Sequence, residues 1–122
     1  MVAFEEMDKN VTIFAQLEVD TAPVILINTF TVAPQDVEHL LAAWTADADW
    51  MRHQPGYIST QLHRGVGGSC VFLNYAVWES MEDFKRAFHH PEFRARLNNY
   101  PERAVASPHL FEKVAVPRIC LG

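Results

Sequence analysis

The sequence has few of the features that mark secreted, membrane-bound or metal-binding proteins. It contains only two cysteines, Cys70 and Cys120, and neither lies at a spacing typical of a metal site. No apolar run approaches the length of a membrane span, and the N-terminus lacks the charge and apolar pattern of a signal peptide. We therefore expect no membrane contact, a cytoplasmic location and two free thiols in place of a disulfide.

Positive charge is also scarce. The chain has 10 Lys and Arg residues against 15 Asp and Glu residues, which gives a net charge of -5 without any basic stripe. Nucleic acid is therefore not expected as a partner. The six histidines show no zinc-binding spacing, and the glycines of residues 65–69 are followed neither by a helix nor by Lys-Ser/Thr. We expect neither a bound metal nor a phosphate-binding loop.

The strongest pattern that is present predicts a strand at residues 70–78. This stretch is rich in Val, Phe, Tyr and Trp and contains no Pro or Gly. Because side chains alternate along a strand, Asn74 and Trp78 share one face with Phe72 and Ala76. A buried amide costs stability unless it is hydrogen-bonded. Asn74 therefore either has a partner in the core or faces a pocket with its amide free for a ligand.

The first predicted helix starts at Pro34, a residue that suits a first helical turn, and ends before the breaker at residues 54–56. Its apolar positions recur at helical spacing. They are Val37, Leu40, Leu41, Trp44, Ala48 and Met51. The acidic residues of this helix are expected mostly off that stripe. They are Asp36, Glu38, Asp47 and Asp49.

The remaining patterns complete a single domain of 122 residues. The expected elements are strands at 24–32, 57–63, 70–78 and 109–116, and helices at 34–53, 81–88 and 92–99. Residues 11–19 form either a short strand or an ordered arm. We assign 1–22 to an N-terminal arm or extra strand, 23–117 to the domain and 118–122 to a C-terminal tail.

This β-α-β-β-α-β order predicts an α+β, ferredoxin-like split fold. Such a fold has a four-stranded antiparallel sheet with both helices on one face. The other face of the sheet is also apolar and carries Tyr75. Because an uncovered apolar face usually meets a partner, we expect a homodimer in which two sheets pack face to face.

Four segments together resemble the antibiotic biosynthesis monooxygenase family, and within it the cofactor-free anthrone oxygenases of aromatic polyketide pathways. The segments are V-I-L-I-N-T-F-T-V, Q-P-G-Y-I, F-L-N-Y-A-V-W and F-x-x-A-F with P-E-F, spread over residues 23–116. The most specific of these motifs is N-x-x-x-W at Asn74 and Trp78.

The resemblance implies a dimeric α+β barrel and a cofactor-independent monooxygenase. Such an enzyme oxidises a polycyclic phenolic, anthrone-type intermediate to a quinone, with O2 as co-substrate and without flavin or metal. The resemblance implies Asn74 and Trp78 as catalytic residues in a pocket between sheet and helices. The implied substrate-binding residues are Asn28, Phe30, Phe72, Phe84, Phe88 and Leu97.

The expected chemistry suits these residue types. An anthrone C–H is acidic because its carbanion is delocalised over the phenolic rings, so the substrate itself supplies electrons to O2. The protein then needs an apolar pocket, a polar donor and exclusion of water, and no strong base. A haem site is disfavoured, because Ala87 and Leu97 stand where the haem-degrading branch has its tryptophan and histidine.

Two other functions fit the same fold. One is a non-oxidative cyclase or isomerase, and the other is a small-molecule-binding protein without catalysis. His63 is a further candidate, as a weak base at the pocket mouth.

Overall fold

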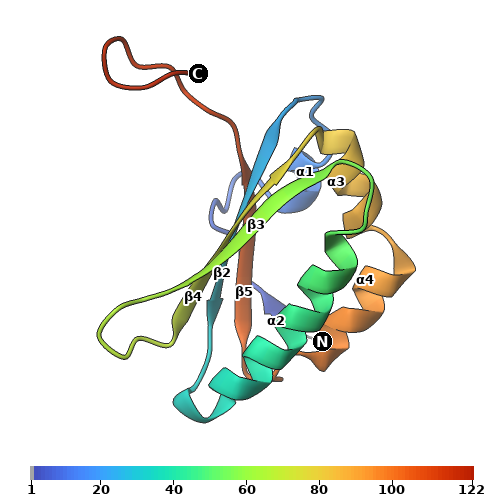
Figure 1. Ribbon diagram of the computed structural model, residues 1–122, viewed down its shortest axis with the longest axis vertical. Coiled ribbons are helices and arrows are strands. Elements are labelled where there is room, and N and C mark those ends of the chain that lie inside the picture. Colours follow the sequence, from blue (N-terminus) through green and yellow to red (C-terminus); the bar gives the residue numbers. More distant parts are fainter. Residues whose placement is uncertain (1) are drawn as a thin grey trace.

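A mixed five-stranded sheet with helices over one face forms the body of the molecule in the computed structural model, which describes residues 2–122 (Figure 1). The strands are β1 (Ala3–Phe4), β2 (Val24–Thr31), β3 (Tyr57–Arg64), β4 (Val71–Trp78) and β5 (Val105–Phe111). The α-helices are α1 (Ile13–Gln16), α2 (Val37–Met51), α3 (Met81–Phe88) and α4 (Pro91–Arg96), with 3₁₀ turns η1 (Pro34–Asp36) and η2 (Leu97–Asn99). The strand order is β1-β5-β2-β4-β3, and only the β1–β5 pair is parallel.

The α+β, ferredoxin-like class is therefore confirmed, but the expected four-stranded antiparallel sheet is wrong. The N-terminal segment adds the fifth strand, β1, which pairs with the outer edge of β5. Within residues 11–19, for which a short strand or an ordered arm was expected, the chain forms α1, capped by the Thr12 side chain. Ile13 and Leu17 of this region are buried in the core.

The position of the last strand also differs from the prediction, because β5 spans Val105–Phe111 and not 109–116. Pro108 suggested a break, yet it lies within the strand. The backbone groups of Ala106 and Leu110 bond outward, to Glu5 and to the Gln16 side chain. Pro108 shares their direction, so its missing N–H faces the sheet edge and removes no bond to β2.

Gln16 closes that same edge beyond the end of β1. Its Oε1 accepts from the Leu110 N–H (3.0 Å) and its Nε2 donates to the Leu110 carbonyl (2.9 Å). One amide side chain thus supplies the donor and the acceptor that a neighbouring strand would supply.

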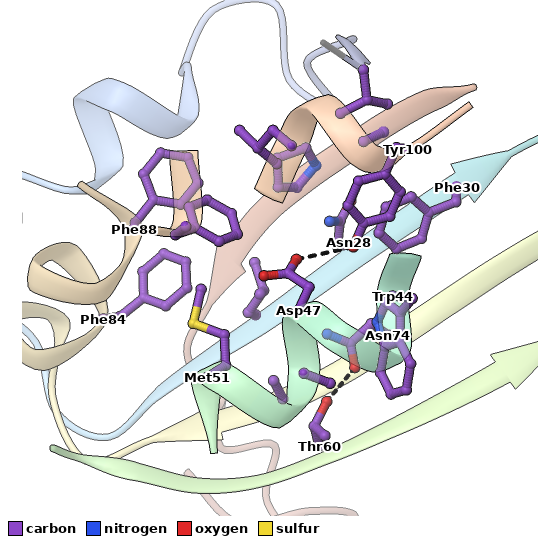
Figure 2. A pocket seen from close by; sticks show the side chains of 18 of the residues that line it. Asn28, Phe30, Trp44, Asp47, Met51, Thr60, Asn74, Phe84, Phe88 and Tyr100 are labelled. Atoms are coloured by element: carbon purple, nitrogen blue, oxygen red, sulfur yellow. Dashed lines mark hydrogen bonds between the residues drawn. The ribbon is translucent and has the colours of Figure 1, made fainter. Parts of the chain in front are cut away.

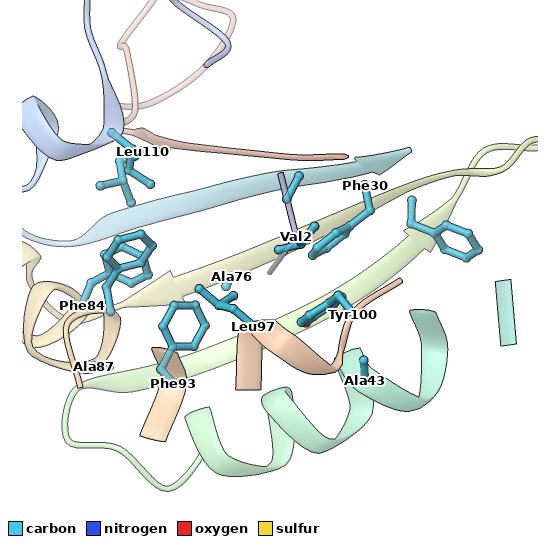
Figure 3. Packing of buried hydrophobic residues seen from close by; sticks show 14 of the residues in the cluster. Val2, Phe30, Ala43, Ala76, Phe84, Ala87, Phe93, Leu97, Tyr100 and Leu110 are labelled. Atoms are coloured by element: carbon cyan, nitrogen blue, oxygen red, sulfur yellow. The ribbon is translucent and has the colours of Figure 1, made fainter. Parts of the chain in front are cut away.

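The core lies between the sheet and the helices (Figure 3). The α3 helix starts at Ser80, whose Oγ accepts from the Asp83 N–H (3.1 Å) and donates to the Asp83 carboxylate (2.9 Å). This cap directs Phe84 and Phe88 inward, where their ring centroids are 5.6 Å apart.

The α2 helix packs with most of the predicted face, since Leu40 is buried and Val37, Trp44 and Met51 pack against the core. Two buried positions and one exposed position differ from the prediction. Ala43 and Asp47 are buried together with Leu40, whereas Leu41 is exposed. Asp47 was expected off the apolar stripe, and it is the one charged side chain buried within residues 2–122.

The opposite face of the sheet carries no helix (Figure 1). Strand register places Ile27, Leu73, Tyr75 and Val77 together there. Tyr75 is 40% exposed, and so is Phe111 at the end of β5. The centre of this surface is apolar and open in the single chain, and Gln61 and His63 of β3 lie beside it.

Candidate functional site

Two asparagines form the polar centre of the helix-covered sheet face. Asn28 on β2 and Asn74 on β4 are directly opposite in the strand register, and Pro108 of β5 and Leu62 of β3 flank them in the same row. Directly opposed residues place their Cβ atoms about 4.5–5.5 Å apart. The two amides therefore act on one small volume.

A pocket lies over this asparagine pair, between the sheet and the helices (Figure 2). The space between its walls, counted out into open solvent at the mouth, is about 710 Å³. The walls are mostly aromatic and aliphatic, and the lining comprises Val2, Phe4, Leu26, Asn28, Phe30, Trp44, Asp47, Ala48, Met51, Tyr57, Thr60, Asn74, Ala76, Trp78, Phe84, Phe88, Phe93, Leu97, Tyr100, Ala106 and Pro108.

The amide of Asn74 is oriented by its neighbour on β3. The hydroxyl of Thr60 donates to Asn74 Oδ1 (Figure 2). Since the oxygen is engaged, the Nδ2 hydrogens of Asn74 are the groups left for a ligand.

Asn28 offers the opposite polarity. Its Oδ1 is buried and has no hydrogen-bond partner within residues 2–122. A buried acceptor without a donor is uncommon and costs stability. This oxygen is free to accept a hydrogen bond from an O–H or N–H group of a ligand.

Trp78 lies at the far end of the same strand face. Its ring packs edge-on against Tyr57 and Phe84, with centroid distances of 5.6 Å in both cases. These contacts fix the indole as a rigid part of the pocket wall.

Asp47 enters the pocket from α2. Its Oδ2 accepts a hydrogen bond from the Tyr100 hydroxyl (2.9 Å), and its Oδ1 is buried without a partner within residues 2–122 (Figure 2). Burial raises the pKa of Asp47 to about 6, against smaller lowering effects of Tyr100 and Arg96. Burial and the Asp47 charge raise the pKa of Tyr100, so the phenol stays a donor.

Most residues expected at the site line this pocket. They are Asn28, Phe30, Asn74, Trp78, Phe84, Phe88 and Leu97. Phe72 does not line it. Although Phe72 shares the strand face of Asn74, it is buried one row further along, with the Arg64 guanidinium 5.2 Å from its ring centroid. His63 is exposed and pairs with Leu73 on the uncovered face, so it is not at the pocket mouth.

Sequence reasoning missed Asp47, Thr60 and Tyr100 as site residues. A signal for Asp47 did exist, since it lies three residues after Trp44 and four before Met51 and so shares their side of the helix. Thr60 and Tyr100 become recognisable only when β3 and η2 are brought to the pocket.

No group of three or more His, Cys, Asp or Glu side chains arranged to hold a metal ion occurs among residues 2–122. In that same range, no helix is long and apolar enough to cross a membrane. Cys70 and Cys120 are both unbridged.

The chain thus forms an α+β, ferredoxin-like protein with a mostly apolar pocket between the sheet and the helices. The family model described as antibiotic biosynthesis monooxygenase matches residues 23–97. The chain therefore belongs to the antibiotic biosynthesis monooxygenase family, as its sequence motifs predicted.

Named relatives and solved structures agree with this membership. Tetracenomycin-F1 monooxygenase of Streptomyces glaucescens is 40% identical over 68 residues, which cover 52% of this chain and 56% of that protein. The match thus spans little more than half the length of that relative. A candidate monooxygenase from Shewanella loihica PV-4 has 35% identity and a TM-score of 0.67, and the match covers 78% of this chain and 97% of the other.

SnoaB of Streptomyces nogalater, described as a cofactor-independent oxygenase, has 25% identity and a TM-score of 0.68. That match covers 80% of this chain and 99% of SnoaB. One of these relatives is named a monooxygenase and SnoaB an oxygenase, which supports the oxidoreductase class expected for this chain.

Proposed function

We propose that this protein is a cofactor-independent monooxygenase that oxidises an anthrone-type polycyclic phenol to a quinone with O2. The observation that carries the proposal is the asparagine pair at the centre of an apolar, aromatic-walled pocket. Such walls suit a flat polycyclic substrate, and the two amides suit its oxygen atoms.

The polarity of the pair defines how the substrate lies. A phenolic O–H donates to the unpartnered Asn28 Oδ1, and the Asn74 Nδ2 hydrogens face the oxygen on which charge develops. Thr60 holds Asn74 in that orientation before the substrate arrives. Preorganised donors stabilise developing charge because they need no reorientation during the reaction.

The overall reaction converts the methylene group of the anthrone and one O2 molecule into a carbonyl group and one water molecule. The substrate carbanion gives one electron to O2, and the resulting radical pair combines to a peroxide anion. Protonation gives a hydroperoxide, and loss of the second C–H proton with cleavage of the O–O bond gives the carbonyl and water. All four electrons come from the substrate carbon, so this balance requires no flavin or metal.

Residues from the covering helices exclude water from this space. Phe84 and Phe88 come from α3, and Phe93 and Leu97 from the α4–η2 segment. A dry pocket strengthens the interactions of Asn74 with charge and protects the carbanion from bulk water.

We propose further that the protein is a homodimer through its uncovered sheet face, centred on Leu73, Tyr75 and Val77. The support is the open apolar surface in the single chain. Light scattering at micromolar concentration tests this: Tyr75→Arg should give monomers, and the exposed Asn98→Arg should stay dimeric. A wild-type monomer contradicts the proposal.

Oxygen uptake with dithranol in metal-chelated buffer tests the proposed activity. Wild-type protein should consume one O2 per anthrone oxidised. Asn74→Ala should lower kcat roughly a hundredfold, because one charge-stabilising donor is lost. Trp78→Phe keeps the aromatic wall and removes the N–H, so it should fold normally and react more slowly. The matched control is Asn98→Ala, at an exposed asparagine of η2.

Three outcomes are informative. Oxygen uptake that depends on Asn74 but not on Asn98 supports the proposal. Conversion of a polyketide substrate without oxygen uptake indicates a non-oxidative cyclase or isomerase. Anthrone binding without turnover indicates a binding protein.

A further inference from the structure

Asp47 occupies a position where a carboxyl group brings no benefit to folding. It lies on the buried side of α2 together with Leu40 and Ala43. An isolated buried charge is costly unless it is paired. A leucine or alanine would continue the apolar face at no such cost, so the presence of Asp47 calls for another explanation.

No cation forms an ion pair with this carboxylate within residues 2–122, and the charge of Arg96 lowers its pKa by less than burial raises it. Arg96 on α4 is the nearby positive side chain, but its Nη1 donates to the Ala46 carbonyl (3.0 Å) and its Nη2 to Glu92 (2.9 Å). Tyr100 supplies one neutral hydrogen bond to Oδ2. Oδ1 remains unpartnered at the pocket.

The other walls of the pocket contribute no further charge among the described residues. The sheet presents the neutral side chains of Asn28, Thr60 and Asn74, and α3 presents two phenylalanines. The titratable or charged groups to be considered around Asp47 are therefore Arg96, Glu92 and Tyr100, in addition to Asp49 on its own helix. Tyr57 also lines the pocket, from β3, and burial raises the pKa of its phenol. Asp49 is exposed and paired with Arg52 (2.7 Å).

We propose that Asp47 is the base that takes the C–H proton of the substrate held over the Asn28–Asn74 pair, with Tyr100 as the residue that positions its carboxylate. This inference rests on the proposed oxygenase function and deepens it. It also revises the expectation that the reaction needs no protein base.

The proton transfers balance over one turnover. The Asp47 carboxylate takes the first proton from the anthrone methylene group, and the electron pair of the broken C–H bond stays on the substrate as the carbanion. After O2 adds, the peroxide anion takes this proton back and becomes the hydroperoxide. Asp47 then removes the second C–H proton as the O–O bond breaks, and the departing hydroxide receives that proton to form water.

The neighbours of Asp47 suit these steps. Burial raises its pKa to about 6, so at neutral pH the group is ionised and more basic than an exposed carboxylate. Tyr100 is itself held in place, since its ring stacks on Phe30 at 5.6 Å with an interplanar angle of 7°. Oδ2 is thereby fixed, and Oδ1 is the atom free to accept a proton.

The first experiment measures kcat/KM for oxygen uptake with dithranol between pH 5 and 9. Wild type should lose activity about tenfold per pH unit below pH 6, as the base becomes protonated. Asp47→Asn should react at least roughly a hundredfold more slowly at pH 7 and lack this acid limb. Tyr100→Phe should retain turnover, but its kcat/KM should begin to fall at a higher pH than that of wild type. The reason is that a hydrogen bond that lowers the Asp47 pKa is lost. Asp49→Asn, on the exposed side of the same helix, should behave as wild type.

A second experiment separates the base from the oxygenase chemistry. Under anaerobic conditions in D2O, wild type should catalyse exchange of deuterium into the dithranol methylene group, as followed by NMR, and Asp47→Asn should not. Exchange without oxygen uptake in air would support Asp47 and reject the proposed oxygenase. If Asp47→Asn kept the wild-type rate of oxygen uptake, the same fall in activity at acid pH and the same deuterium exchange, Asp47 would be rejected as the base. The proposed oxygenase activity would then still hold. Absence of both activities in the wild type would reject both.

Discussion

Replacing Asp47 by Asn should make the folded protein more stable, and the gain should depend on pH. Burial raises the pKa of Asp47 from its ordinary 3.8 to about 6. Each pH unit of this difference corresponds to about 1.4 kcal/mol, so ionised Asp47 destabilises the fold by about 3 kcal/mol relative to the protonated group. Asn keeps the size of the side chain and an oxygen for the Tyr100 hydroxyl, but it never ionises.

The sign of the pH dependence follows from the two pKa values. Below pH 3.8 the carboxyl is protonated in the folded and the unfolded chain, and wild type and variant differ little. Between pH 3.8 and 6 the folded state keeps a proton that the unfolded state releases, so wild-type stability falls as pH rises. Above pH 6 the full cost of burying the ionised Asp47 carboxylate is present. The advantage of Asp47→Asn should therefore grow by about 2–3 kcal/mol between pH 4 and pH 8.

Urea unfolding followed by tryptophan fluorescence at pH 4, 5, 6 and 8 measures this difference, at one protein concentration so that any association contributes equally. Asp49→Asn is the matched control. It removes an exposed carboxylate whose pKa is lowered by Arg52, so it should gain nothing as pH rises. A constant difference between Asp47→Asn and wild type across this range would refute the argument that Asp47 is ionised in an unfavourable environment.

Three further predictions concern the parts of the fold that position the pocket. Gly56→Ala should destabilise the protein by at least about 1 kcal/mol more than Gly67→Ala. Both positions have positive φ, but only at Gly56 would the new Cβ lie 2.3 Å from Asp83. Equal unfolding midpoints of the two variants would contradict this. Gln16→Ala should cost about 1–3 kcal/mol through the unpaired Leu110 N–H and carbonyl, and faster amide exchange at Leu110 should accompany it. Phe72→Leu should lower stability by ~1 kcal/mol and leave kcat/KM within about twofold, whereas Phe30→Leu, inside the pocket, should raise KM; a raised KM in Phe72→Leu would place it at the substrate.

The parts of the structure that local sequence determines were predictable. The nine-residue run ending at Trp78 predicted β4, and its alternation placed Asn74 and Trp78 on the pocket side. Ser80 predicted the start of α3, since its cap requires only a bond three residues along the chain.

The errors have a common origin in contacts between distant segments. From the sequence alone, Pro108 predicts the end of a strand. Whether its missing N–H removes a hydrogen bond depends on which strands flank β5, and the sequence does not show this. Phe72 does not line the pocket, although Phe30 directly opposite it on β2 does, because strand parity gives the face of a residue but not its position across the sheet relative to the covering helices. The rotation of α2 that buries Asp47 depends on packing against Tyr100, 53 residues away.

The unpartnered polar atoms show where this fold departs from the most stable arrangement. Asn28 Oδ1 and Asp47 Oδ1 are both buried without partners among the described residues, one on the sheet and one on the helix that covers it, and both belong to the same pocket. Arg96 Nε and His109 Nδ1 are also buried without partners among these residues, but neither residue lines the pocket. Two acceptors directed to one apolar space suit a ligand that carries donors and an acidic hydrogen.

The segments that complete the pocket extend this argument to specificity. The family match ends at residue 97 and begins at residue 23, yet Val2, Phe4 and Tyr100 line the pocket from outside it. The N-terminal strand and the residues after η2 therefore help to shape the space around Asn74 and Trp78. Since the Tyr100 hydroxyl also donates to Asp47, the segment after η2 both lines the pocket and positions the proposed base. A substrate preference of this chain should accordingly follow these flanking residues more closely than the Asn74–Trp78 motif.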